Sequence, residues 1–401
     1  MEQWKEINAT EFCYHITDGT HDSPKAVPEG KFLITSKHIK NDQIDFDSAY
    51  KISEEDYFKI VSRSKVDKWD IIISMIGAYC GFCYLQDNNQ TDFAIKNVGL
   101  FKVGEEYKCK WLYYYLTSPQ GKQQLAMMRS GSSQPYIALN SLRNLKIPCP
   151  SKEIMVAVVS ILDSIDKKIR LNRQINDNLE QQAQALFKSW FVDFEPFKDG
   201  EFVDSELGMI PKGWRVGKLS DIADVTMGQS PSGESYNENG IGEIFYQGRT
   251  EFGDRFPSIR LYTTAPNRMA ESNSILLSVR APVGDINVAL QKCCIGRGLA
   301  SINAIDNYYS FVFYTVKSMK KDFDVYNGEG TVFGSINKDS LNNMSVIIPT
   351  DDIKSNFENI VSKLDNEYRL NHSEIVNLSN LRDTLLPRLI SGELKINEIN
   401  C

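Results

Sequence analysis

The sequence predicts an α+β protein: two mixed domains of strands and helices in tandem repeat, joined by two long antiparallel helices that form a coiled coil. Two observations predict this architecture. One half of the chain repeats the pattern of the other, and each copy ends in a long helical segment with apolar residues at heptad spacing. The 401 residues are enough for two domains with a core each.

The internal repeat is clearest in the helical segments. The string DKKIRLN (166–172) recurs as DNEYRLN (365–371). Further upstream, DIIISMIGAYCG (70–81) resembles NSILLSVRAPVG (273–284). The chain therefore consists of two copies of one sequence pattern in tandem.

Each copy has the same order of parts. Short apolar runs separated by Gly, Ser, Asn and Pro predict a mixed domain, and a proline followed by a capping Ser151 or Thr350 begins each helical segment. We expect a first domain at 1–150, a long helix at 151–192, a linker at 193–213, a second domain at 214–349, a second long helix at 350–394 and a tail at 395–401.

Apolar stripes run along both predicted helices. With about 35 residues and about 1.5 Å per residue, either helix would be roughly 50 Å long. One long helix per copy packs most simply as an antiparallel pair. The stripe residues are Ile154, Val158, Ile161, Ile165, Ile175, Leu179 and Leu186 in the first helix, and Ile353, Phe357, Ile360, Leu364, Leu378, Leu381 and Leu385 in the second.

Two asparagines interrupt these stripes. Asn172 and Asn371 fall at equivalent core positions near the middle of each helix. A polar residue there either fixes the pairing register at a cost in stability or is tolerated at a solvated edge. We favour the register role.

Composition and charge bound the class of protein. The chain begins without a basic segment followed by an apolar one, so we expect no signal peptide and a cytoplasmic protein. The two mixed domains have balanced charge, and the helical segments carry the whole net charge of −7. This charge distribution argues against a protein that coats nucleic acid without sequence specificity. It is compatible with locally basic loops that recognise particular bases.

Two motifs suggest chemistry that the sequence does not otherwise support. GQSPSGES (228–235) is close to a phosphate-binding loop but has Glu234 in place of the lysine, and we interpret it as a surface loop. Cys80 and Cys83 form a C-x-x-C pair, but a zinc site needs further ligands. We expect buried cysteines, no metal site and no catalytic residues in this chain.

Basic and amide side chains gather in the Gly-rich turns of both domains. Arg, Lys, Gln and Ser have the donor and acceptor geometry that reads base edges, and glycine allows close approach to a backbone. Ordinary solvated turns would have a similar composition. The candidate DNA-binding residues are Lys37, His38, Lys40, Ser132, Ser133, Gln134 and Tyr136 in the first domain, and Gln229, Ser230, Gln247, Arg249, Arg255, Arg280 and Arg297 in the second.

Several longer strings carry a family resemblance. LFKSWFVDFEPF (186–197), GMIPKGWRVGKLSDIA (208–223), GQSPSGESYN (228–237) and LLPRLISGEL (385–394) resemble the specificity subunits of type I restriction-modification systems. The resemblance covers essentially the full chain. Its order of target-recognition domain, helix, target-recognition domain, helix matches the repeat.

The resemblance implies a non-catalytic protein that selects the DNA sequence for a larger complex. It implies double-stranded DNA, two methyltransferase subunits and two translocating restriction subunits as partners, and no membrane. S-adenosylmethionine, ATP and Mg²⁺ would be used by the partner subunits, with no cofactor in this chain. A coiled-coil scaffold that does not bind DNA and a self-sufficient restriction or methylation enzyme are the alternatives.

Apolar residues at the helix ends exceed what two thin helices need for their mutual contact. We expect some of them to contact the methyltransferase subunits, although packing within this chain is an equal alternative. These candidate partner-interface residues are Trp190, Phe191, Phe194, Leu386 and Leu389.

Overall fold

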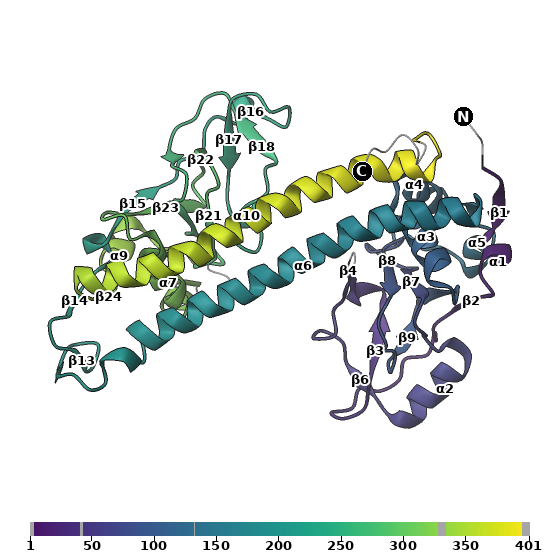
Figure 1. Ribbon diagram of the computed structural model, residues 1–401, viewed down its shortest axis with the longest axis horizontal. Coiled ribbons are helices and arrows are strands. Elements are labelled where there is room, and N and C mark those ends of the chain that lie inside the picture. The colour runs from purple at the N-terminus through teal and green to yellow at the C-terminus, as the bar shows by residue number, and fades with distance from the viewer. Residues whose placement is uncertain (1–3, 41–42, 132, 328–333, 395–401) are drawn as a thin grey trace. The chain divides into compact units, whose positions relative to one another are not determined.

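The computed structural model describes residues 4–40, 43–131, 133–327 and 334–394, so Ser132 and the predicted tail at 395–401 lie outside the described residues. The chain forms two compact units, Met1–Asn172 with Ser373–Cys401 and Arg173–His372. Each unit contains one mixed domain and part of both long helices, α6 (Lys152–Phe191) and α10 (Asp351–Ile390) (Figure 1).

The two long helices pair in antiparallel orientation within each unit, as predicted. Each has 40 residues, or roughly 60 Å at about 1.5 Å per residue, which is longer than expected. Contacts between the helices follow opposite sequence orders: Asp166 with Arg382 and Asn172 with Glu374 in the first unit, and Asn176 with Tyr368 and Phe187 with Phe357 in the second.

The predicted apolar stripes are only partly buried. Val158 and Phe357 are almost fully buried, whereas Ile360 is 46% exposed and Leu381 is 47% exposed. A straight α-helix has 3.6 residues per turn, so a strict heptad stripe drifts by about 20° per heptad around its surface. Residues of one heptad row therefore leave the contact along a 40-residue helix.

Both mixed domains have the same sheet topology, which confirms the tandem repeat. A four-stranded antiparallel sheet has the order β2-β10-β7-β8 in the first domain and β15-β23-β20-β21 in the second. A parallel pair, β3 with β9 and β17 with β22, lies in a further sheet of each domain. Strand pairs β1-β11 and β14-β24 join the start of each domain to its end.

In the first domain, α3 and α4 follow the last strand of the four-stranded sheet and α5 precedes β11. The elements are β1 (Glu6–Asn8), α1 (Ala9–Phe12), β2 (His15–Asp18), β3 (Lys31–Thr35), β4 (Ile39–Lys40), β5 (Gln43–Ile44), β6 (Lys51–Ile52), α2 (Glu54–Ser64), β7 (Asp70–Ser74), β8 (Cys83–Gln86), β9 (Ala94–Lys96), β10 (Val98–Lys102), α3 (Glu106–Thr117), α4 (Pro119–Met127), α5 (Leu139–Arg143) and β11 (Lys146–Pro148).

In the second domain, α7, α8 and α9 take the places of α3, α4 and α5. The elements after α6 are β12 (Phe202–Val203), β13 (Ile210–Pro211), β14 (Arg215–Lys218), β15 (Ala223–Met227), β16 (Tyr236–Asn237), β17 (Glu243–Tyr246), β18 (Leu261–Thr263), β19 (Met269–Ala270), β20 (Ile275–Ser278), β21 (Ile286–Val288), β22 (Cys293–Ile295), β23 (Leu299–Ala304), α7 (Tyr309–Ser318), α8 (Lys320–Asp324), α9 (Lys338–Asn342) and β24 (Ser345–Ile348).

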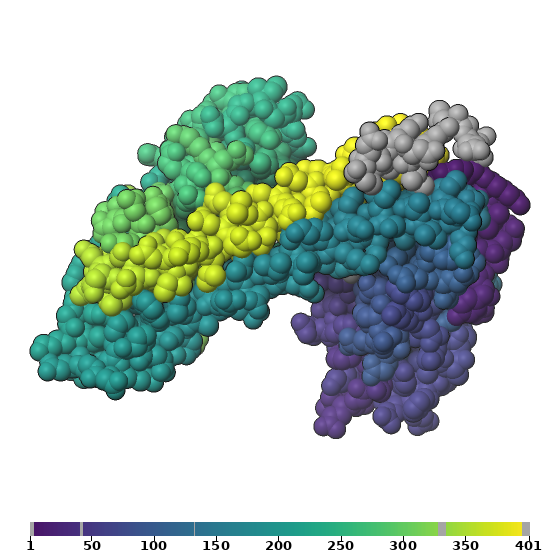
Figure 2. Space-filling model, in the orientation of Figure 1, coloured from purple at the N-terminus to yellow at the C-terminus, as the bar shows by residue number. Residues whose placement is uncertain are grey.

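The domains differ around the parallel strand pair. In the first domain, β3 lies between β6 and β9, and α2 packs on this sheet through Tyr57 and Ile60. In the second, β16 and β18 extend the sheet to five strands, with the order β16-β18-β17-β22-β19. Figure 2 shows the resulting lobe as a green protrusion beside α10.

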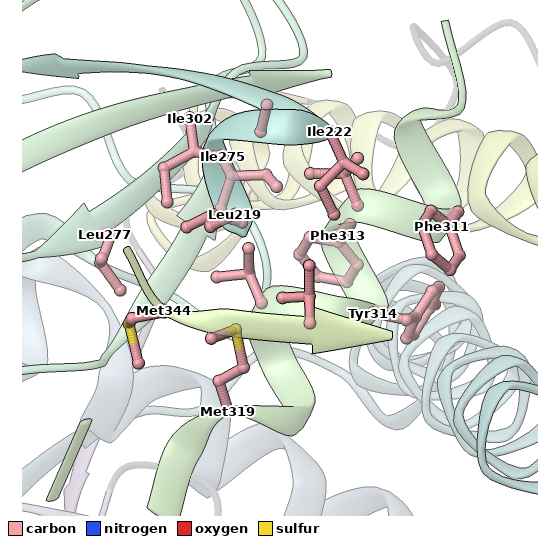
Figure 3. Packing of buried hydrophobic residues seen from close by; sticks show 14 of the residues in the cluster. Leu219, Ile222, Ile275, Leu277, Ile302, Phe311, Phe313, Tyr314, Met319 and Met344 are labelled. Carbon is pink, nitrogen blue, oxygen red and sulfur yellow. The ribbon is translucent and has the colours of Figure 1, made fainter. Parts of the chain in front are cut away.

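The helices supply part of each domain's core. The core of the second domain contains side chains of β20, β23 and α7 that point toward one another, among them Ile275, Ile302 and Phe313 (Figure 3). Phe187 of α6 and Phe357 of α10 belong to the same core. The first core likewise contains residues of α6 and α10, namely Met155, Val158, Val159, Leu162, Leu386, Leu389 and Ile390.

Candidate nucleic-acid interface

Five loops of the second domain meet at one edge of its sheets, and we call them the second loop face: residues 228–230, 247–249, 279–285, 296–298 and 334–336. Backbone hydrogen bonds join them. Val279 N donates to Gly298 O at 3.0 Å, Gly298 N donates to Gln247 O at 3.3 Å, and Ala281 N donates to Gly334 O at 3.0 Å. Residues far apart in sequence thus share one surface.

Glycines permit the close approach of these loops. A Cβ built at Gly228 would lie 2.2 Å from Gly296 O, and one at Gly296 would lie 2.9 Å from Gln247 Cα. Any larger residue would force the loops apart. The glycines that suggested close approach to a nucleic-acid backbone therefore serve packing between loops first.

Most candidate residues of the second domain project from this face. Gln229, Gln247, Arg249, Arg280 and Arg297 are exposed and Ser230 is half-buried. The Arg297 amide donates to Ser230 Oγ at 3.2 Å, which fixes two of the loops together. The structure brings these six residues onto one surface.

One of these arginines already has a partner. Arg249 and Lys320 both bind Asp285. Partial burial raises the pKa of Asp285, but the hydrogen bonds from Lys320 and Arg249 outweigh it, and the pKa is lowered overall. Asp285 is therefore ionised, and a phosphate would have to compete with it for Arg249.

Arg255 lies away from the loop face. It is 7% exposed and contacts both helices through Glu180 on α6, at 3.1 Å, and Asp365 on α10, at 2.6 Å. Burial by itself would lower its pKa, but the charge of Asp365 and further negative groups raise it, so the guanidinium stays charged. In this structure Arg255 attaches the second domain to the helices.

The first domain has an equivalent surface, the first loop face: residues 19–23, 36–40, 75–82, 129–131 and 133–137. Ser133, Gln134 and Tyr136 are exposed on it. Tyr136 exchanges two backbone hydrogen bonds with Ser130, at 2.8 and 2.9 Å, and Gly77 N donates to Pro135 O at 2.8 Å. These bonds hold the 129–137 loop beside the 75–82 loop.

The segment around η1 (Ser36–His38) contributes the remaining candidates. Lys37 is exposed, and Lys40 is exposed and binds Asp45 at 2.6 Å, which raises its pKa. His38 is fully buried, its Nδ1 accepts a hydrogen bond from Thr35 N at 3.0 Å, and burial lowers its pKa. In this conformation the neutral His38 ring shapes the turn that presents the two lysines.

Sequence reasoning missed several residues of the first loop face. Tyr79 and Phe82 are exposed there, although they belong to an apolar run. His21 occupies the position that corresponds to Ser230 in the second domain. The two preceding amides show this correspondence: Gly19 N donates to Val98 O and Thr20 N to Ile95 O. In the second domain, Gly228 N donates to Leu299 O and Gln229 N to Ile295 O. Comparison of the repeats would have found His21, but exposure of an aromatic ring leaves no mark in sequence.

The GQSPSGES loop does not open an α-helix, as a phosphate-binding loop of this sequence type would. A phosphate-binding loop points free backbone amides at its ligand and opens a helix. Here the amides of Gly228, Gln229 and Ser235 donate to carbonyl groups of the protein, and only a short 3₁₀ turn, Gly233–Ser235, follows. The loop is part of the second loop face, in agreement with its interpretation as a surface loop.

The candidate partner-interface residues pack inside the chain. Phe191 is 5% exposed in the second core, with Trp190 and Phe194 packed against that core. Leu386 and Leu389 are 6% and 0% exposed in the first core. Contact with a partner subunit stays a prediction for the half-buried pair, Trp190 and Phe194.

Asn172 and Asn371 are buried, as a register role requires. Asn172 is fully buried and its Nδ2 donates to Glu374 Oε2 at 2.7 Å, across the helix pair of the first unit. Asn371 is 8% exposed in the second unit. Asn176, which the heptad reading did not single out, donates to Tyr368 O at 3.3 Å.

The described residues contain no group of three or more His, Cys, Asp or Glu side chains arranged to hold a metal ion. Cys80, Cys83, Cys293 and Cys294 are buried free thiols, and burial raises the pKa of Cys83 to about 12. Among the same residues, no helix has the length and apolar character needed to cross a membrane.

Comparisons with known proteins identify the family. A model of the type I restriction modification DNA specificity domain matches residues 1–181 and 211–380, so the chain belongs to this family and contains two copies of its domain. The putative type I restriction enzyme MjaX specificity subunit of Methanocaldococcus jannaschii is 34% identical over 66% of this chain and 63% of its own length, which is less than two thirds of that relative.

Two further matches span nearly the full length. The type I restriction enzyme HindI specificity subunit of Haemophilus influenzae is 24% identical over 98% of this chain and 100% of its own. The crystal structure of the type I restriction-modification system S subunit from M. genitalium has a TM-score of 0.59 at 19% identity, covering 96% of both chains. This last likeness concerns the fold.

Proposed function

We propose that this chain is the DNA sequence-specificity subunit of a type I restriction-modification complex. Its two domains read the two halves of a bipartite, asymmetric target, and the paired helices set the distance between the halves and help to dock methyltransferase subunits. One observation carries the proposal: two loop faces are built on the same backbone plan but present different side chains. Such a pair suits two unequal half-sites.

In this proposal the chain is non-catalytic and needs no cofactor of its own. Two methyltransferase subunits use S-adenosylmethionine to methylate adenine, and two restriction subunits use ATP and Mg²⁺ for translocation and cleavage. The complex is cytoplasmic and acts on double-stranded DNA. The membership of the specificity-domain family supports these assignments.

The test is to co-express the chain with a methyltransferase subunit from the same genome and to map methylated adenines by single-molecule sequencing. We expect one bipartite motif with two different specified blocks and a fixed unspecified gap. The purified complex should shift a duplex with this motif, with an affinity that falls linearly with salt on logarithmic axes.

Two outcomes would reject the proposal in different ways. Co-purification with the methyltransferase without any specific duplex shift would indicate a scaffold. Methylation or cleavage by the chain alone would indicate a self-sufficient enzyme.

A further inference from the structure

The two loop faces share a backbone frame in detail. Three backbone hydrogen bonds of the first loop face recur in the second domain. In the first domain, Ile137 N donates to Met75 O, Gly77 N to Pro135 O and Gly81 N to Ser74 O. The corresponding bonds of the second domain run from Ile336 N to Val279 O, from Ala281 N to Gly334 O and from Gly284 N to Ser278 O. This correspondence places Ile76 of the first domain where the second has Arg280, and Tyr136 where the second has Ser335.

The first domain fills this frame with apolar side chains. Tyr79 is 37% exposed, Phe82 is 36% exposed and Tyr136 is 45% exposed. The rings of Tyr79 and Phe82 meet edge to face, with centroids 5.6 Å apart. Ile76 is half-buried next to Tyr136, with which it forms a backbone bridge. The result is an apolar surface around two touching loops.

Positive charge adjoins this apolar surface. Lys40 is exposed on the 36–40 segment of the same loop face. Lys37 is exposed and forms no ion pair with any described residue. An apolar surface with lysines beside it is suited to DNA, which combines negatively charged phosphates with the apolar methyl groups of thymine in the major groove.

The second domain fills the same frame with arginine. Arg280 and Arg297 are exposed, and neither forms an ion pair with a described residue. Among the described residues, no carboxylate binds their guanidinium groups, whereas that of Arg249 binds Asp285. Arginine donates two hydrogen bonds to O6 and N7 of guanine, the commonest specific contact in the major groove.

We infer that the two halves of the target are read by different chemistry: the first domain contacts thymine methyl groups through Tyr79, Phe82 and Tyr136, and the second contacts guanine through Arg280 and Arg297. The inference rests on the proposed function and adds the base chemistry of each half-site. It requires guanine in the half bound by the second domain.

The experiment uses the complex of the full chain with its methyltransferase subunits and a duplex of its mapped target. Deoxyuridine replaces thymidine in one half-site at a time, which removes only the methyl groups. In separate duplexes, 7-deazaguanine replaces guanine in one half-site at a time, which removes only N7. We expect uracil to weaken binding through one half-site alone, by about fourfold per buried methyl. Deazaguanine should weaken it through the other, by about fivefold or more.

Protein variants connect each half-site to its domain. In the Tyr79→Ser variant, uracil should weaken binding less than in the unaltered protein, because one of the three side chains that contact the methyl groups is already lost. In the Arg280→Met variant, deazaguanine should weaken binding less than in the unaltered protein, because only Arg297 remains to contact guanine. Exposed residues away from the loop faces serve as matched controls: Tyr14→Ser, at the opposite end of β2, and Arg215→Met, on β14, should keep the full sensitivity to both bases.

The outcomes separate this inference from the proposed function. If the unmodified target binds no better than a scrambled duplex, the proposed function fails and the inference with it. If the target binds specifically but both half-sites respond alike to the base substitutions, the proposed function stands and the inference is wrong. The same holds if Tyr79→Ser leaves DNA binding unchanged and only weakens the association with the methyltransferase subunits. Absence of guanine from the second half-site would also contradict it.

Discussion

Arg249 and Arg255 show how far two residues of one turn can differ in role. Arg249 is exposed at the second loop face and binds Asp285. Arg255 is buried against Glu180 and Asp365, with its guanidinium 4.4 Å from the Phe313 ring centroid. We expect the first to contact DNA, whereas the second binds carboxylates of both helices.

The Arg255→Met substitution should therefore act on stability. It leaves Asp365 and Glu180 partly buried without their common cation, and removal of one partner of a buried ion pair costs about 3–5 kcal/mol. Because Lys317 still binds Glu180, we expect the lower end of this range. Chemical denaturation measures the loss, and the salt dependence of DNA binding by the remaining folded protein should be unchanged.

Arg249→Met is the matched comparison. Its ion pair is half-exposed, so the free energy of unfolding should change by less than about 1 kcal/mol. If Arg249 contacts a phosphate, the slope of log affinity against log salt should fall by about one. A reversed pattern, with Arg255→Met lowering the slope and Arg249→Met lowering stability, would contradict these placements.

The difference between the exposed Arg249 and the buried Arg255 could not be predicted from the sequence. Turn composition placed both arginines in one Gly-rich segment, but whether a side chain turns inward depends on the partner that it meets, and Asp365 is distant in sequence. Tyr79 and Phe82 were missed for the converse reason. An apolar run predicts burial, and only the tertiary structure shows which rings remain exposed.

At the scale of elements, the acidic residues of the two long helices form ion pairs with basic residues of the mixed domains. Asp163 of α6 binds Lys110 of α3 at 3.0 Å. In the second unit, Glu180 of α6 binds Arg255 and Lys317, and Asp365 of α10 binds Arg255. The net negative charge of the helical segments thus provides carboxylates that anchor each domain.

The C-terminal end of α10 should be essential to the first unit. Leu389 is fully buried in the first core, so Leu389→Ala removes packing and leaves a cavity, at a cost of about 2–5 kcal/mol. Leu381→Ala, at a position of the same helix that is 47% exposed, should cost much less. Hydrogen exchange of the β7 and β10 amides reports on the first unit. Equal protection in both variants would contradict the assigned packing.

The length of the helices should determine the gap in the target. Adding seven residues after Asn172, with a matching addition after Asn371, lengthens each helix by about 10 Å, or about three base pairs of rise. We expect the unspecified gap to change, or modification to be lost with rotational phase, while both specified blocks stay the same. Methylation mapping measures this, and full activity at the original spacing would show that the helices do not set the distance.

At the scale of the whole molecule, each domain has its own sheets and its own loop face. Replacing residues 1–150 with those of a relative should therefore change one half of the methylated motif and leave the other half intact. The reciprocal replacement of 214–349 serves as the control and should change the other half. A single exchange that alters both halves would show that the domains do not read independently.

The tandem architecture could be predicted from the sequence because a repeat and a heptad pattern are written along the chain. DKKIRLN and DNEYRLN lie on α6 and α10, and both strings occur where the helices pair. The strand order β2-β10-β7-β8 could not be predicted, because pairing between distant strands has no local pattern. Nor did the repeat reveal that α2 and the β16-β18 extension make the two domains unequal.

The discontinuous first unit has a consequence for the order of folding on the ribosome. The second unit is a single continuous stretch, Arg173–His372, so all of its core residues are available once that stretch has emerged. The first domain is synthesised earlier, yet Leu386, Leu389 and Ile390 of its core follow the whole of the second unit in the chain. Because domains fold as units during synthesis, we expect the second unit to complete its core first. Termination before the end of α10 would leave an apolar gap in the domain that was made first, a surface that chaperones and proteases recognise in unfinished chains.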